Sequence, residues 1–167
     1  LQPGSELAWG IQAGRQPYGN SLEVLKYFVF KDPQWNWRTF DFSRHLALLD
    51  DTGHLLKATD PNLKPFASRG GKLLMYHGWS DSTIAPETTI DYHRRVLETM
   101  GGPAQTSEWV RLFMVPGMHH CIGGDGPDSF DALGTLEAWV ERGKAPDRIT
   151  ASQDRKSTRL NSSHGAL

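Results

Sequence analysis

The residues best suited to chemistry follow two short apolar segments of the chain. Asp81 comes shortly after the apolar run at residues 73–76, and His120 comes shortly after the run at residues 110–115. In open α/β sheets, functional groups gather just beyond the carboxyl ends of the strands. A carboxylate that orients a histidine supplies two of the three members of a nucleophilic triad. The two positions therefore predict an acid–base pair that assists a nucleophile.

The serine nucleophile that would complete such a triad is not expected within this chain. In α/β-hydrolases the triad follows the chain order Ser, Asp, His, and the serine lies in a G-x-S-x-G turn. That pattern does not occur here, and the nearest string, residues 66–70, lacks the first glycine and precedes a strand. Ser80 and Ser82 flank Asp81 and are interpreted as loop hydroxyls. We therefore expect the nucleophile to lie before Asp81 and outside this chain.

The elements that must position the pair alternate between strand and helix. The run at residues 73–76 is continuously apolar, as a strand of a buried parallel sheet is, and a second strand is expected at residues 110–115, ended by Pro116 and Gly117. Helices are expected over residues 86–100 and residues 128–142, the second capped by Asp128. This order predicts an α/β fold with a parallel sheet, of which only the last two strand–helix units are present. The side chains expected to be buried by the last helix are Phe130, Leu133, Leu136 and Val140.

The first part of the chain differs from this regular middle. Residues 1–60 are rich in Trp and Phe and are broken by Gly and Pro, so they are interpreted as part of a lid or insertion. Short helices are expected there at residues 21–27 and 43–49. Residues 61–153 are the predicted core, and they are expected to be an incomplete domain.

The two ends of the chain carry further information. The chain starts at Leu1 and not at Met, which indicates a piece of a longer protein. Residues 154–167 are interpreted as a non-native tail, because residues 154–164 correspond to the translation of a common short-read sequencing adapter. Such a segment carries no information about the fold.

The composition excludes several classes of protein. The 167 residues carry 18 Lys and Arg against 19 Asp and Glu, for a formal net charge of -1, which excludes a strongly basic nucleic-acid binder. No apolar run approaches the ~18 residues that a membrane-spanning helix needs. The single cysteine, Cys121, forbids a disulfide within the chain. We therefore expect neither a nucleic acid nor a membrane as a partner.

Three segments together resemble the carboxy-terminal part of the tannase and feruloyl esterase family. They are residues 70–81, which end in Gly-Trp-Ser-Asp, residues 116–121, which read Pro-Gly-Met-His-His-Cys, and residues 123–127. The resemblance implies an α/β-hydrolase core with a lid domain that cleaves esters of aromatic acids. It covers roughly residues 60–150 and is looser before them.

The resemblance also implies roles for individual residues. Asp81 would be the triad acid, His120 the base, and Cys121 half of a disulfide whose partner precedes the missing serine. Trp9 and Trp79 would contact the aromatic ester substrate. No cofactor is expected in this chain, because the calcium loop of the family's lid would lie before Leu1. A disulfide implies an oxidising compartment, so a secreted or periplasmic enzyme is expected.

Plainer interpretations of these residues stay open. Asp81 can be read as a helix cap or loop residue. His119 competes with His120 for the role of base, and the His-Cys order of the family selects His120. His77 and His93 are interpreted as core or surface histidines.

Two other functions are also consistent with the sequence. One is a non-catalytic module in which the Trp-rich first third binds a phenolic compound or a carbohydrate. The other is a zinc protein that uses the loop around the two adjacent histidines, although adjacent residues rarely share one tetrahedral metal. Its ligands would be His119, His120, Cys121 and Asp125. The acyl and alcohol specificity and the oligomeric state are not readable from the sequence.

Overall fold

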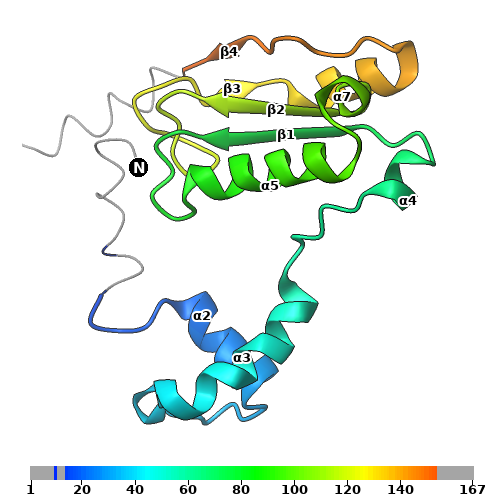
Figure 1. Cartoon of the computed structure of the whole chain (residues 1–167). Helices are drawn as coiled ribbons and strands as arrows, with labels where there is room; N and C mark the ends of the chain where they lie inside the picture. The colour runs from blue at the N-terminus through cyan, green and yellow to red at the C-terminus, as the bar shows by residue number, and fades with distance from the viewer. Residues whose placement is uncertain (1–9, 11–13, 154–167) are drawn as a thin grey trace, which may run out of the picture. The chain divides into compact units, whose positions relative to one another are not determined.

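The structure is a computed structural model that describes residue 10 and residues 14–153 (Figure 1). The described residues divide into two compact units, one up to Asp60 and the other from Pro61 onward. In the described part of the chain, no helix combines the length and the apolar character needed to cross a membrane.

The second unit is built on two parallel strands. Strand β1 (Leu73–Gly78) pairs with β2 (Val110–Val115), in a register that runs from Leu73 opposite Val110 to Gly78 opposite Val115 (Figure 1). The parallel pairing predicted from the sequence is confirmed. The second strand has the predicted bounds, whereas the first continues beyond Tyr76, because His77 and Gly78 extend the ladder opposite Met114 and Val115.

Helices precede and connect the two strands. The short helix α4 (Lys64–Ala67) precedes β1, and α5 (Pro86–Thr99) and α6 (Pro103–Thr106) lie between β1 and β2. Pro86 stands at the start of α5, where its missing N–H has no intrahelical partner to lose. Val96 of this helix is fully buried. The helix predicted over residues 86–100 is therefore confirmed to within one residue of its end.

The last helix starts later than the sequence predicted. Helix α7 (Ala132–Arg142) is capped by Asp131, whose carboxylate accepts a hydrogen bond from the Gly134 N–H at 2.8 Å. Asp128 does not cap it. Residues 129–130 instead form the short strand β3 (Ser129–Phe130), which pairs antiparallel with β4 (Ala151–Ser152) and delays the helix. Gly143 ends α7 as expected, in the left-handed conformation with φ 66°.

The face that α7 buries also differs from the prediction. Leu133 and Val140 are 69% and 59% exposed, whereas Trp139 is only 2% exposed. The Trp139 ring lies under two cations, the Lys72 ammonium 5.6 Å from its centroid and the Arg111 guanidinium 5.4 Å from it. The apolar residues of this helix spread over more than one face. Among the described residues, the face with the large indole is the buried one, because it offers the most area and the cation–π contacts.

The first unit is mostly helical. Its elements are α2 (Gly19–Glu23), a π-helical segment (Val24–Val29), a 3-10 turn (Trp37–Thr39) and α3 (Phe42–Leu56). The helix predicted at residues 21–27 falls within the run formed by α2 and the π-helical segment, and the one predicted at residues 43–49 is the first half of the longer α3. Asp41 caps α3 by accepting a hydrogen bond from the Ser43 N–H at 2.8 Å.

Aromatic rings pack against one another in this unit. Phe30 and Trp35 stack with centroids 4.2 Å apart, and Phe40 meets both of them edge-on. These rings form a partly exposed aromatic cluster within residues 14–60. The interpretation of this segment as a lid stays a prediction.

Candidate active site

Asp81 lies in the loop that leaves the carboxyl end of β1. It is 1% exposed, and its Oδ1 accepts hydrogen bonds from the N–H groups of Thr83 and Ile84 at 2.8 and 2.9 Å. These bonds form an Asx-type turn between β1 and α5, which fixes the carboxylate relative to the strand. The second oxygen, Oδ2, takes no part in these two bonds and contacts histidine side chains instead.

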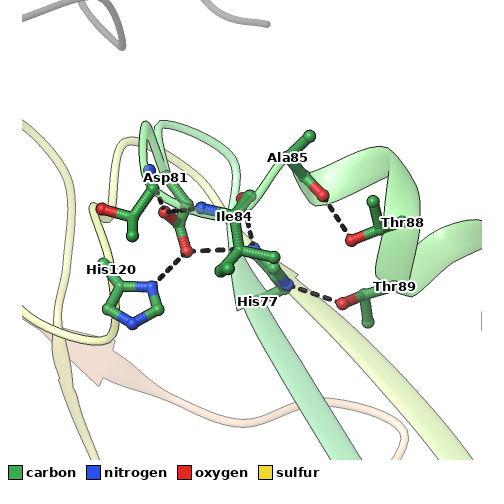
Figure 2. A network of polar contacts seen from close by, with 8 residues as sticks. His77, Asp81, Ile84, Ala85, Thr88, Thr89 and His120 are labelled. Atoms are coloured by element: carbon green, nitrogen blue, oxygen red, sulfur yellow. Dashed lines mark hydrogen bonds and ion pairs between the residues drawn. The ribbon is translucent and has the colours of Figure 1, made fainter. Parts of the chain in front are cut away.

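His120 reaches Oδ2 from the loop that follows β2. Its Nδ1 lies 2.8 Å from Asp81 Oδ2, and Figure 2 shows the imidazole beside the carboxylate. Because an ionised carboxylate only accepts hydrogen bonds, we assign the hydrogen to Nδ1, which leaves Nε2 of the neutral ring as a base. The His120 side chain is 53% exposed, so the ring extends from a buried partner toward the surface.

The surroundings of Asp81 favour its ionised form. Burial raises the pKa of this carboxyl, but the hydrogen bonds from the Ile84 N–H, from His120 and from the Thr83 N–H lower it by more. The pKa of Asp81 therefore lies below its usual value. An ionised, immobilised carboxylate is the group that holds a histidine in one tautomer and stabilises the imidazolium.

A second histidine, His77, also contacts Asp81. Its Nε2 lies 3.1 Å from Asp81 Oδ2, on a different side of the carboxylate from His120 (Figure 2). The sequence interpretation of His77 as an ordinary core or surface histidine missed this contact. The available signal was its position four residues before Asp81, near the end of the strand that leads into the Asp81 loop.

Backbone contacts hold the two loops together. The Trp79 N–H donates to the Val115 carbonyl at 2.9 Å, and the Ser80 N–H donates to the Met118 carbonyl at 3.0 Å. Gly78 makes this approach possible, because a Cβ at this position would lie 2.2 Å from the Met118 oxygen. The side chains of Asp81 and His120 meet because their backbones are joined just before them.

The loop that carries His120 is folded back on itself. Met118 and Gly124 form an isolated antiparallel bridge, and Asp128 accepts a hydrogen bond from the Gly123 N–H at 2.7 Å. The loop at residues 123–128 is therefore a tight turn closed by Asp128. Cys121 follows His120 with φ 67°, a conformation that is uncommon for a residue other than glycine, and its thiol is free and exposed.

The other residues singled out in the sequence have different surroundings. His120 contacts Asp81, whereas the His119 ring lies near Gly124, where an added Cβ would be 3.1 Å from its Cδ2. Trp79 is half-buried in the loop before Asp81. Trp9 lies outside the described residues. Within residues 14–153, no three His, Cys, Asp or Glu side chains gather closely enough to hold a metal ion, so the zinc interpretation gains no support.

Comparison of the sequence with known proteins identifies relatives of this chain. The profile of the tannase and feruloyl esterase family matches residues 15–165. A probable feruloyl esterase B-2 of Aspergillus terreus is 37% identical over 170 residues, which cover 92% of this chain and 32% of that protein. The mono(2-hydroxyethyl) terephthalate hydrolase of Piscinibacter sakaiensis is 51% identical over 94 residues, which cover 56% of this chain and 15% of that enzyme.

Solved structures give the same result. Feruloyl esterase B from Aspergillus oryzae matches with a TM-score of 0.78 at 28% identity, over 94% of this chain and 35% of that one. The tannin acyl hydrolase from Aspergillus niger matches with a TM-score of 0.64 at 25% identity, over 80% of this chain and 27% of that one. The chain thus spans about a third of the length of the feruloyl esterase that it matches. Since the family profile covers most of the sequence, this chain belongs to the tannase and feruloyl esterase family.

Proposed function

We propose that this chain supplies the acid and the base of a serine carboxylic ester hydrolase, and that a serine outside the chain supplies the nucleophile. The observation that supports the proposal is the hydrogen bond of 2.8 Å between His120 Nδ1 and the buried Asp81 carboxylate. It leaves Nε2 on a half-exposed ring, where a hydroxyl group could approach. On this proposal, residues 61–153 are the carboxy-terminal part of an α/β-hydrolase sheet, and the chain alone is inactive.

The proposed reaction has two steps. In the first, Nε2 of His120 takes the proton of the serine hydroxyl as the oxygen attacks the ester carbonyl, and then returns it to the departing alcohol. In the second, His120 takes a proton from water, which attacks the acyl-serine, and returns that proton to the serine. Asp81 keeps the ring in one tautomer and stabilises the imidazolium in both steps.

The proposed substrates are esters of aromatic acids, of the feruloyl or galloyl type. The relatives' names support this class, since they refer to feruloyl, tannin and terephthalate esters. Trp79, in the loop beside Asp81, is a proposed contact for the aromatic acyl group, as is Trp9.

Cys121 is proposed to form a disulfide with a cysteine outside the chain. Its exposed thiol beside His120 supports this, because a bond there would hold the base against the missing segment. The same proposal places the enzyme in a secreted or periplasmic compartment.

The test begins with the source DNA. Recovering the longer reading frame shows whether a serine within G-x-S-x-G precedes residue 1 and whether residues 154–164 are native. The full-length protein should hydrolyse methyl ferulate or methyl gallate. Asp81→Asn should lower kcat by about 10⁴-fold and His120→Ala by about 10⁶-fold. His93→Phe, a histidine substitution on α5, is the matched control and should leave kcat unchanged. Saturable binding of ferulic acid without turnover would contradict the proposal and favour a binding module.

A further inference from the structure

We propose that His77 is a positioning residue that holds the Asp81 carboxylate in the orientation from which it orients His120. This inference rests on the proposed function, because it assigns His77 a part in the same acid–base unit. His77 touches neither the base nor, on this proposal, the substrate. It acts only through Asp81.

The contacts of His77 determine where its hydrogen lies. Nε2 is 3.1 Å from the Ile84 carbonyl oxygen, to which it is hydrogen-bonded, and 3.1 Å from Asp81 Oδ2. Both neighbours are acceptors, so Nε2 carries a hydrogen. Nδ1 lies 2.7 Å from Thr89 Oγ1, whose hydroxyl can donate to it. Thr89 and Ile84 therefore select the tautomer with the hydrogen on Nε2, which bonds to the Ile84 carbonyl and lies equally close to the Asp81 carboxylate (Figure 2).

His77 is itself held rigidly. It belongs to β1, where it stands opposite Met114 in the parallel ladder, and its side chain is only 11% exposed. Thr89, which fixes the other ring nitrogen, belongs to α5. The His77 ring therefore contacts α5 through Thr89 and the turn after β1 through Ile84, and these contacts hold it beside the Asp81 carboxylate.

The consequence for Asp81 follows from the separate environments of its two oxygens. Oδ1 is fixed by the N–H groups of Thr83 and Ile84. Oδ2 is approached by His120 from the exposed side and by His77 from the interior. Without the interior group, Oδ2 would depend on the half-exposed His120 ring alone, and the carboxylate plane could turn about the Oδ1 contacts. A misplacement of about 1 Å in a catalytic group can cost up to roughly 100-fold in rate.

The test is a double-mutant cycle in the full-length enzyme. His77→Phe keeps the ring volume and removes the N–H, so we expect kcat for methyl ferulate to fall by between about 10- and 100-fold with KM unchanged. In an Asp81→Asn background the same substitution should have no further effect on kcat, since His77 acts through that carboxylate. A merely structural role would lower kcat by the same factor in both backgrounds.

Two further variants keep the test decisive if His77→Phe folds poorly. His77→Gln places an amide N–H near the position of Nε2 and should recover most of the lost kcat. Thr89→Val removes the hydroxyl that selects the tautomer and should lower kcat in the same direction by a smaller factor. His93→Phe is the matched control on α5 and should leave kcat unchanged.

The outcomes separate this inference from the proposed function. If Asp81→Asn leaves hydrolysis intact, the proposed function fails, and this inference fails with it. If Asp81→Asn abolishes hydrolysis but His77→Phe lowers kcat equally in both backgrounds, or not at all, only the role of His77 is overturned.

Discussion

At the scale of single residues, Asp81 is the most constrained polar group of the candidate site. It is almost completely buried, yet both of its oxygens have partners: two backbone N–H groups bond to Oδ1, and His120 bonds to Oδ2, with the His77 ring 3.1 Å away. A buried carboxylate without partners would strongly favour its neutral form. Here the hydrogen bonds offset the cost of burial, so a charge can be kept under a half-exposed histidine.

The lowered pKa of Asp81 predicts a pH dependence of stability. A carboxyl group whose pKa is lower in the folded than in the unfolded protein stabilises the fold above its unfolded pKa of about 3.9. That contribution is lost as the pH falls through the folded value. We expect the full-length enzyme to unfold at a higher temperature than Asp81→Asn at pH 7, and the difference to shrink at pH 3. Thermal unfolding followed by circular dichroism measures both, and a difference independent of pH would contradict the prediction.

At the same scale, the sequence predicted one contact of Asp81 and missed another. Asp81 and His120 follow two predicted strands, and because functional groups gather beyond the carboxyl ends of such strands, this position was enough to predict their contact. His77 was missed because its importance depends on Thr89 and Ile84, whose positions follow from the turn into α5. The sequence around a histidine at a strand end does not show which of its ring nitrogens carries the hydrogen.

At the scale of elements, the approach of the two loops depends on Gly78. This residue ends β1, and its Cα faces the carbonyl oxygens of Met118 and His119, 2.2 and 2.5 Å from where a Cβ would lie. No side chain fits there without separating the strand end from the loop that carries His120. The geometry of the acid–base pair is therefore set partly by a residue with no side chain.

Gly78→Ala tests this dependence. The added methyl group would push the backbone near Met118 away and lengthen the contact between His120 and Asp81. We expect the free energy of unfolding to fall by about 1–3 kcal/mol, the typical cost of overpacking, and kcat to fall as well. Gly19→Ala is the control, since nothing lies within 4 Å of a Cβ there. A Gly78→Ala enzyme with full kcat would show that the loops can separate without harm.

The elements themselves were predicted unevenly. The bounds of β2 follow from a mainly apolar segment that Pro116 ends, and Gly143 ends α7 as its type suggests. The start of α7 was placed too early because β3 pairs with β4, about twenty residues further on, and local patterns contain no sign of this pairing. Its buried face was wrong because Trp139 packs under Lys72 and Arg111, which belong to distant segments.

At the scale of the whole molecule, the described sheet is small for its length of chain. Strands β1 and β2 pair only with each other among the described residues, and β3 and β4 form a separate pair. Two-stranded sheets are marginally stable in water, and each open edge is available for pairing with other chains. Large apolar side chains such as Leu133 and Val140 are also left exposed.

We therefore expect the isolated chain of 167 residues to fold poorly. It should be sparingly soluble or melt without cooperativity, and it should bind a hydrophobic dye. The full-length protein should melt in a cooperative transition and leave the dye unbound. Calorimetry and dye fluorescence on both proteins make the comparison. A soluble monomer of the isolated chain with a sharp transition would refute the expectation.

The acid and the base arise within a single strand–helix–strand unit, from β1 to the loop after β2. If the nucleophile lies elsewhere, as proposed, a gene divided ahead of residue 61 yields two polypeptides, neither of which can turn over an ester. Activity would return only when the two meet. The modest size of this unit makes it a candidate half of a split reporter, whose signal would count encounters between the proteins fused to its two parts.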